Sequence, residues 1–195
     1  FNAVDVDIVK NYGIHVIIGV IFGAIFAASL DTKSLILFFI TVICLLAIYL
    51  LFIKEKETQI NLKISFLTKM IFGFAVGFIS APMGIGGAIM NVPILKYFGY
   101  SINRAIGSAA AIGFFIAFFG ALGFLILGFL LKANLPLSIG FINIPAFLIF
   151  IPITTIMAKV GANTVHKIEK KKISKLFGIF LVIVASKLLY DYFQF

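Results

Sequence analysis

Residues 73–93 read GFAVGFISAPMGIGGAIMNVP, and this stretch decides the fold. It lies within a run without Asp, Glu, Lys or Arg that extends from position 70 to position 95. Such a run is long enough for a transmembrane helix, which needs about 20 predominantly apolar residues. Pro82, Pro93 and the glycines between them interrupt the run, and a helix interior loses about 3 kcal/mol with a proline and about 1 kcal/mol with a glycine. We therefore predict a membrane-spanning helix that is broken.

A broken backbone at membrane depth survives where protein buries it or where it lines a polar cavity, because lipid cannot bond the freed N–H and C=O groups. A half-helix that begins near Gly86 would point free amides and a positive dipole end into such a cavity. Ser80 and Asn91 would add neutral hydrogen-bonding groups on either side. The segment favours a site for a small anion; the alternative is a proline kink with glycine packing and no ligand.

The residues around the break add to this prediction. Gly73 and Gly77 share one helix face, where another helix can approach closely. Ser108 lies one helical turn after the start of the next uncharged run. There its hydroxyl would either reach the cavity or bond the carbonyl four residues earlier in its own helix. Arg104 at the membrane boundary would either guide anions or anchor the interface. The predicted substrate-binding residues are Ser80, Gly84, Gly86, Gly87, Asn91, Pro93, Gly107 and Ser108.

The composition supports a membrane protein. Hydrophobic residues make up 63% of the 195 residues and charged residues only 12%. A soluble domain carries about 25% charged residues, so a soluble globular protein, a disordered chain and a nucleic-acid-binding protein are excluded. The predicted surroundings are the lipid bilayer. The net charge of +9 fits loops that face anionic headgroups, and alone it does not indicate an anionic substrate.

The uncharged runs predict the number of crossings. Five runs lack charged residues and a sixth carries lysines only near its ends, at 11–30, 34–53, 70–95, 105–131, 133–158 and 173–190. Apolar residues fill both alternate positions of these runs, which favours helices over barrel strands. The predicted fold class is all-α and polytopic, with about six transmembrane helices. Lys and Arg divide almost evenly between the two sides, so they do not fix the orientation.

The polar segment 54–69 is the predicted boundary between two halves. Residues 13–53 and 143–190 share the order of a Gly-rich helix and a second apolar helix, whereas the helices between them have no upstream counterpart. This echo predicts the last two helices of a first repeat module at 1–53, an inter-module loop at 54–69 and a second four-helix module at 70–195. If the chain is a duplication, the unmatched middle pair of helices predicts that about 60 residues of the first module are missing, and a first residue of Phe1 rather than Met agrees with a fragment.

Patterns for catalysis or metal binding are missing from the sequence. Cys44 is the single cysteine and is interpreted as an apolar filler. His15 and His166 have no partner at metal-ligand spacing, and no acidic residue lies near the centre of a span. The sequence therefore predicts no catalytic residue, no enzyme activity, no metal and no cofactor.

Three motifs carry a resemblance to a known family. The motif GIGGAIMNVP at 84–93 resembles the signature of the TauE/SafE sulfite-exporter family, and GFAVGFIS at 73–80 and AIGSA at 105–109 are similar to that family as well. The resemblance extends over essentially the whole chain. The chain departs from the family pattern at Ala88, where the usual residue is a third glycine, and at Ser108-Ala109, where it is a Thr-Ser pair.

The resemblance implies a bacterial inner-membrane, multi-pass permease of about eight helices in two repeated modules. Its members are associated with export of sulfite and organosulfonates. The leading hypothesis is therefore a secondary transporter of a small anion, without a cofactor, and homo-oligomerisation is left open. The alternative, from a different class, is a structural membrane subunit that packs through its Gly-rich helices and transports nothing.

Overall fold

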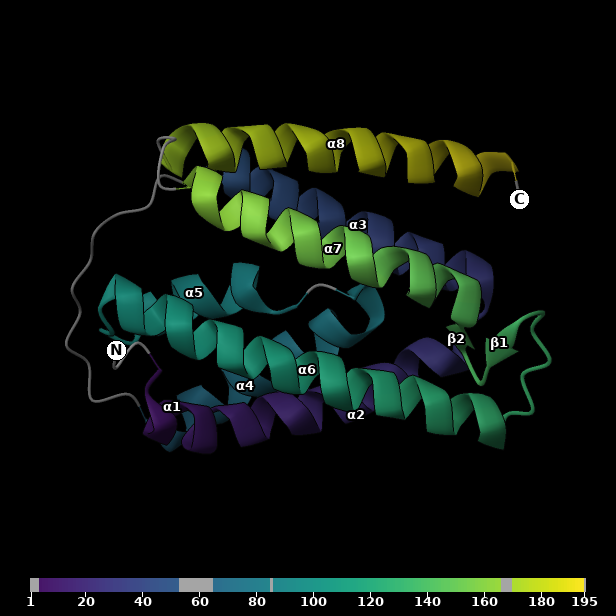
Figure 1. The fold of residues 1–195 in the computed structure, drawn as a ribbon, viewed down its shortest axis with the longest axis horizontal. Helices are drawn as coiled ribbons and strands as arrows, with labels where there is room; N and C mark the ends of the chain where they lie inside the picture. The colour runs from purple at the N-terminus through teal and green to yellow at the C-terminus, as the bar shows by residue number, and fades with distance from the viewer. Residues whose placement is uncertain (1–3, 53–64, 85, 166–169, 195) are drawn as a thin grey trace. The chain divides into compact units, whose positions relative to one another are not determined.

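The computed structural model describes residues 4–52, 65–84, 86–165 and 170–194 (Figure 1). Nearly all of them lie in helices, as predicted. The helices are α1 (Val6–Asn11), α2 (Gly13–Ser29), α3 (Thr32–Phe52), α4 (Phe66–Met83), α5 (Ala88–Tyr97), α6 (Ile102–Leu130), α7 (Ile144–Val165) and α8 (Lys170–Gln194). Two short strands, β1 (Ser138–Ile139) and β2 (Ile142–Asn143), pair with each other.

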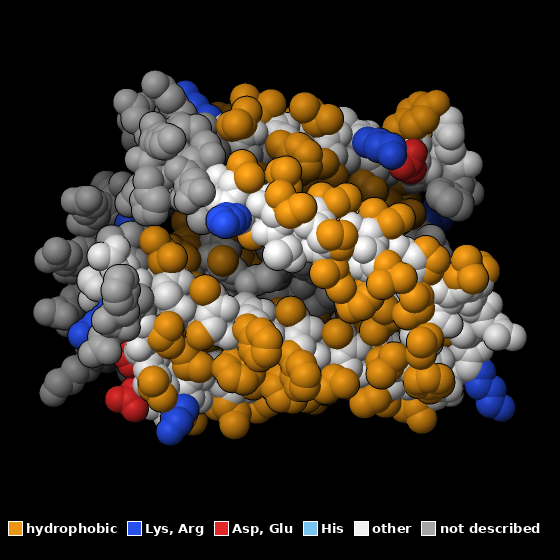
Figure 2. Space-filling model, in the orientation of Figure 1, with side chains coloured by type: hydrophobic (Ala, Val, Ile, Leu, Met, Phe, Trp, Pro, Cys, Tyr) orange, Lys and Arg blue, Asp and Glu red, His pale blue; other side chains and the backbone are white. Residues whose placement is uncertain are grey.

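Six helical segments of the described residues are long and apolar enough to cross a membrane. This confirms the predicted number and the all-α polytopic fold class. Large hydrophobic side chains on their surfaces are exposed, among them Phe114, Phe118 and Ile126 of α6. Figure 2 shows hydrophobic side chains over most of the visible face of α6. Such a surface is stable against lipid rather than against water.

The fifth crossing starts later than the sequence predicts. An uncharged run begins at residue 133, but α7 begins at Ile144. The intervening loop holds the β1–β2 pairing, and Lys132 and Leu137 in it have positive φ angles of 50° and 54°. These backbone conformations end a helix. The prediction of a helix from 133 is therefore wrong, because an absence of charge does not by itself make a segment helical.

The chain divides into two compact units. Helices α1, α2, α4, α5 and α6 belong to the first unit together with β1, and α3, α7 and α8 belong to the second. Each unit thus combines segments that are far apart in the sequence. The repeat modules at 1–53 and 70–195 stay a prediction, and most of the loop at 54–69 lies outside the described residues.

In the first unit, α2 and α4 pack backbone to backbone. A Cβ atom built on Gly77 would lie 2.8 Å from the Val20 nitrogen, and one on Gly73 would lie 2.9 Å from the His15 Cβ. The predicted close approach at these two glycines is therefore confirmed. The α2 side of the contact is also made by glycines, since a Cβ on Gly19 would lie 2.9 Å from the Phe78 nitrogen. Small residues on both helices permit this separation.

The core of the first unit surrounds the junction of α1 and α2. Its members come from α1, α2, α4, α5 and α6 and the segments that join them. Tyr12, Val16, Leu95 and Ile112 are at most 1% exposed. In Figure 1, α6 lies along α2 in this unit. The core therefore packs the last turn of α5, at Leu95, against the first half of α6, from Ala105 to Ile116.

In the second unit, α3 and α8 pack along each other (Figure 1). A Cβ built on Gly178 would lie 2.8 Å from side-chain atoms of Leu51, so the glycine makes room for the leucine. At the other end of the pair, the Lys33 ammonium lies 5.5 Å from the centre of the Tyr192 ring. This cation–π contact joins the beginning of α3 to the end of α8.

Asp31 caps the N-terminus of α3 and gives a pH-dependent prediction. Its carboxylate accepts hydrogen bonds from the Ser34 hydroxyl at 2.6 Å and the Ser34 N–H at 3.1 Å. These bonds hold the pKa of Asp31 below its ordinary value. The carboxylate therefore stabilises the fold at neutral pH, and this contribution is lost as the pH falls through the lowered pKa.

We expect Asp31→Asn to lower the thermal unfolding midpoint slightly at pH 7, and we expect this difference to shrink as the pH falls through the lowered pKa of Asp31, because protonation removes the charge of the wild-type carboxyl group. Unfolding of both proteins in detergent over a series of acidic pH values measures this difference. A difference that stays the same over the whole series would show that the charge of Asp31 has no role.

Candidate functional site

The predicted break between residues 80 and 93 is present in the structure. Helix α4 ends at Met83 and α5 begins at Ala88. Gly84 ends the first helix and Gly87 precedes the second, both in the left-handed conformation with φ angles of 60° and 64°. Residues other than glycine rarely adopt this conformation. The half-helix starts two residues after the expected position near Gly86.

The N-terminus of α5 is held by α6. The Gly87 carbonyl accepts the Asn91 N–H at 2.7 Å, which closes the first turn. A Cβ built on Gly113 of α6 would lie 2.5 Å from the Gly86 carbonyl oxygen, so only a glycine lets α6 pass here. Gly84 and Gly86 themselves are exposed, and a Cβ on either would meet nothing within 4 Å. The break therefore has one packed side and one open side.

The structure buries four polar side chains among the described residues. They are His15, Ser80, Asn91 and Ser108, with exposed fractions of 9%, 1%, 0% and 0%. Three of the four are residues that the sequence predicts for the site. A buried polar group without a hydrogen bond costs about 1–3 kcal/mol, so the partners of each side chain indicate its role.

Asn91 has one bonded end and one free end. Its Oδ1 accepts a hydrogen bond from the Tyr12 hydroxyl at 3.0 Å. Its Nδ2 has no hydrogen-bond partner in the part of the chain that the structure describes. A Cβ built on Gly87 would lie 2.9 Å from this Nδ2, which places the free amide beside the N-terminus of α5. The free Nδ2 of Asn91 and the positive end of the α5 dipole together suit the binding of an anion.

Ser80 is the second buried group without a partner. Its Oγ makes no hydrogen bond to any described residue, although a serine within a helix can bond the carbonyl four residues earlier. It lies in the last turn of α4, directly before the break. Within the described chain, Ser80 and Asn91 are the two residues whose buried side-chain atoms lack partners. Both flank the break.

Ser108 has a structural partner instead. Its Oγ accepts the backbone N–H of Asp5 at 3.0 Å, which ties the start of α1 to α6. Arg104, one turn earlier, lies 3.9 Å from the Asp5 carboxylate and is 57% exposed. An ion pair at this exposure contributes at most about 1 kcal/mol. The observed hydrogen bond of Ser108 therefore joins α6 to Asp5, and not to the break between α4 and α5.

Two further predicted residues, and His15, have different surroundings. Gly107 and Pro93 are half-buried, and Pro93 lies inside α5, where it offers no N–H to the Ile89 carbonyl. His15 packs edge-on against the Phe66 ring, with centroids 5.3 Å apart, and its ring nitrogen lies 2.9 Å from the Asn11 carbonyl. His15 therefore has a packing role; His166 lies outside the described residues.

A comparison with models of known protein families identifies the family of this chain. The family described as "Sulfite exporter TauE/SafE" matches residues 1–188. The chain belongs to the TauE/SafE family. The predicted resemblance is therefore confirmed, and with it an all-α, polytopic membrane protein.

A curated protein of Haemophilus influenzae, named "Probable membrane transporter protein", is 28% identical to this TauE/SafE chain over 170 residues. The match covers 87% of this chain and 64% of that protein, so the chain spans less than two thirds of the length of its relative. No solved structure matches the chain.

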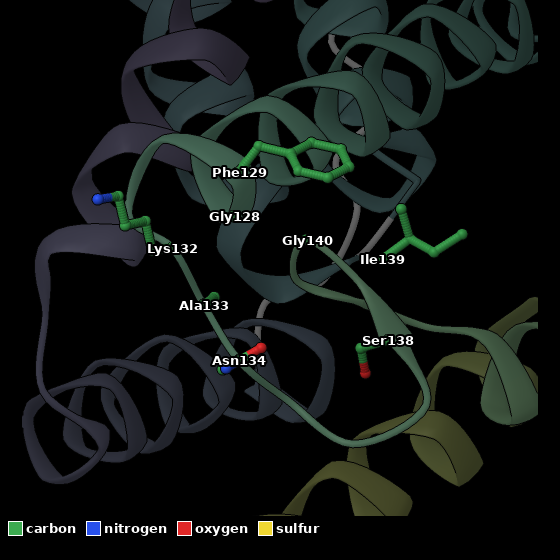
Figure 3. A pocket seen from close by; sticks show the side chains of 8 residues that line it. All are labelled: Gly128, Phe129, Lys132, Ala133, Asn134, Ser138, Ile139 and Gly140. Carbon is green, nitrogen blue, oxygen red and sulfur yellow. The ribbon is translucent and has the colours of Figure 1, made fainter.

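A pocket of this TauE/SafE chain lies at the C-terminal end of α6, away from the break, with a volume of about 410 Å³. It is lined by eight residues between Gly128 and Gly140, and Figure 3 shows Lys132 pointing to the side opposite Ile139. The Ser138 hydroxyl donates to the Pro136 carbonyl at 3.1 Å. Because Lys132 and Asn134 are exposed, this pocket lacks the buried, unpartnered donors found at the break.

The sequence did not indicate three residues that shape the break. Tyr12 lies near the polar start of an uncharged run, 79 positions from Asn91, and nothing local to it signals that contact. Gly113 is one of several glycines in α6, and its role follows only from the packing of α6 on α5. Ile116 is the third, since a Cβ on Gly87 would overlap its side chain.

Proposed function

We propose that the protein is a secondary transporter that binds a small anion at the break between α4 and α5. The free Nδ2 of Asn91 beside the N-terminus of α5 carries this proposal. Membership of the TauE/SafE family and the name of the Haemophilus influenzae relative support it. The location that fits is the inner membrane of a bacterium, with the chain crossing several times.

The chemistry of the break suits a sulfur oxyanion or an organosulfonate. Amides near Gly86 and Gly87, with the Ser80 hydroxyl and the Asn91 amide, would replace part of the hydration of such an anion. All of these donors are neutral. Among the residues whose side chains the structure describes, no Lys or Arg is buried, so the anion would be bound weakly enough to be released on the other side.

The alternative function, a structural membrane subunit, is disfavoured by one observation. It requires Gly73 and Gly77 to pack against a partner protein. In the structure, the helix that fills this face is α2 of the same chain, which meets Gly73 at His15 and Gly77 at Val20. The glycine face is therefore already used within the first unit.

Alanine substitutions at the two unpartnered residues test the transporter. We expect Ser80→Ala and Asn91→Ala each to lower export of sulfite from cells by about tenfold or more, because a hydrogen bond to a charged ligand contributes about 1.5–3 kcal/mol. Export is measured on the full-length protein as the decline of intracellular sulfite. The amount of protein in the membrane is measured in parallel.

Two matched variants serve as controls. Ser29→Ala removes an exposed hydroxyl that is bonded to the Phe26 carbonyl, and Asn103→Ala removes an exposed amide from α6. We expect both to export at the wild-type rate. If Ser80→Ala and Asn91→Ala also exported at that rate, the break would not be the substrate site.

A further inference from the structure

A small pocket opens in the first unit where α1, the start of α4 and the segment between α5 and α6 meet. Its volume is about 110 Å³, enough for several water molecules. Asp7 on its rim is exposed, and Lys69 and Tyr100 are half-buried. Its inner wall is formed by buried side chains, among them Tyr12 and Phe98. We call it the Lys69 pocket.

Tyr12 joins the Lys69 pocket to the break. Its ring lines the pocket, and its hydroxyl donates to Asn91 Oδ1 at 3.0 Å. Phe98 packs edge-on against the ring, with centroids 5.8 Å apart. A Cβ built on Gly73 would lie 3.4 Å from the ring atom Cε2, so α4 packs against the ring as well. The ring therefore separates the pocket from Asn91.

We propose that Tyr12 is a gate between the Lys69 pocket, which acts as an anion vestibule, and the anion site at the break. Rotation of the ring away from Asn91 breaks the hydrogen bond and opens a route between the two. This inference rests on the proposed function, because it takes the Asn91 amide as a ligand-binding group.

Tyr12 is also a positioning residue for Asn91. A side-chain amide has a donor end and an acceptor end. Because the Tyr12 hydroxyl occupies Oδ1, the donor Nδ2 faces the N-terminus of α5 and the acceptor does not. An anion reaching the site then meets a donor rather than a carbonyl oxygen, which would repel it.

The rim of the Lys69 pocket suits the passage of an anion. The Lys69 ammonium attracts a small anion, and the Tyr100 hydroxyl offers it a hydrogen bond. Burial, and then the carboxylates of Asp5 and Asp7, raise the pKa of Tyr100 above its ordinary value, so its hydroxyl stays a neutral donor. Asp7 on the same rim offsets the charge of Lys69, which prevents the vestibule from trapping the anion.

Thiol labelling tests the gate without any transport assay. The full-length protein is prepared in membranes with its native cysteines, Cys44 among them, replaced by alanine, and with Ser80→Cys as the single target. The probe is a small anionic methanethiosulfonate. Tyr12→Phe keeps the ring and removes the bond to Asn91, so we expect labelling about fivefold faster, the shift that one hydrogen bond of ordinary net strength produces. Tyr12→Ala removes the ring, and we expect a larger increase.

Two controls separate the gate from a general loosening of the protein. Tyr97→Phe changes an exposed tyrosine on α5, and we expect it to leave the labelling of Ser80→Cys unchanged. A cysteine at the exposed position Ser29 reports access from outside the gate, and we expect one labelling rate for it whichever residue stands at position 12. An unchanged rate for Ser80→Cys in Tyr12→Phe would overturn the gate.

The same experiment distinguishes the gate from the proposed function. If Tyr12→Phe speeds labelling while Asn91→Ala exports sulfite normally, the route exists but the anion site does not, and the gating of substrate is overturned together with the proposed function. If Asn91→Ala abolishes export and Tyr12→Phe leaves labelling unchanged, the gate alone is overturned. Faster labelling in Tyr12→Phe together with lost export in Asn91→Ala supports both.

Discussion

Replacing Gly77 with leucine is expected to prevent the first unit from folding. A Cβ at this position would lie 2.8 Å from the Val20 nitrogen and would overlap the Val16 carbonyl. The atoms in its way belong to the backbone of α2, so no side-chain rotation relieves the overlap. Overpacking costs about 3 kcal/mol in a tight core, and here two helices must separate. We expect almost no monodisperse protein after extraction in mild detergent, measured by size-exclusion chromatography.

Gly161→Leu is the matched control for this variant. Gly161 also lies inside a membrane-spanning helix, α7, but a Cβ built on it would meet nothing within 4 Å. The change in hydropathy is the same at both positions, and only the packing differs. We expect Gly161→Leu to elute like the wild-type protein. Normal elution of Gly77→Leu would show that α2 and α4 do not pack through their glycines.

Gly87→Leu is expected to abolish anion export while the protein still inserts into the membrane. A Cβ here would lie 2.9 Å from Asn91 Nδ2 and would overlap the Ile116 side chain. The leucine would therefore push the Asn91 amide away from the N-terminus of α5. Loss of the two or more donors that meet there would weaken anion binding by about a hundredfold. Export of sulfite per molecule of membrane-inserted protein measures the effect.

Gly84→Leu separates the effect of the side chain from that of the backbone. Both glycines have left-handed backbones, with φ angles of 60° at Gly84 and 64° at Gly87, so a leucine strains both by about 1–2 kcal/mol. Only at Gly87 does the new side chain reach Asn91, because a Cβ on Gly84 meets nothing within 4 Å. We expect Gly84→Leu to keep a substantial part of the export. Equal losses in the two variants would assign the effect to backbone strain.

The helices were predictable because lipid imposes simple rules on a sequence. Runs without charge predicted the six crossings, and the glycines that follow Pro82 predicted the position of the break, although Pro82 itself lies inside α4 and Pro93 inside α5. The pairing of helices was not predictable in the same way. Gly73 and Gly77 indicate that a helix packs closely there, but they do not say that this helix is α2. That pairing depends on Gly19 and its surroundings, about 50 residues away.

The candidate site was predictable only in part. Ser80 and Asn91 could be chosen because they are polar residues beside a break in an apolar span, and the structure buries both without a full set of partners. Ser108 was chosen because it lies one turn inside the next span, yet its hydroxyl accepts the Asp5 N–H. Such a bond joins residues 103 positions apart and leaves no periodic pattern in the sequence. The contact of Tyr12 with Asn91 is of the same kind.

Anion binding by the purified full-length protein decides whether the break is a substrate site. Titration of the wild-type protein and Asn91→Ala with sulfite, followed by calorimetry in detergent, gives the two dissociation constants. We predict saturable binding to the wild-type protein and binding at least about tenfold weaker to Asn91→Ala, with Asn103→Ala equal to the wild type. Equal dissociation constants for the wild-type protein and Asn91→Ala would contradict an anion site between α4 and α5.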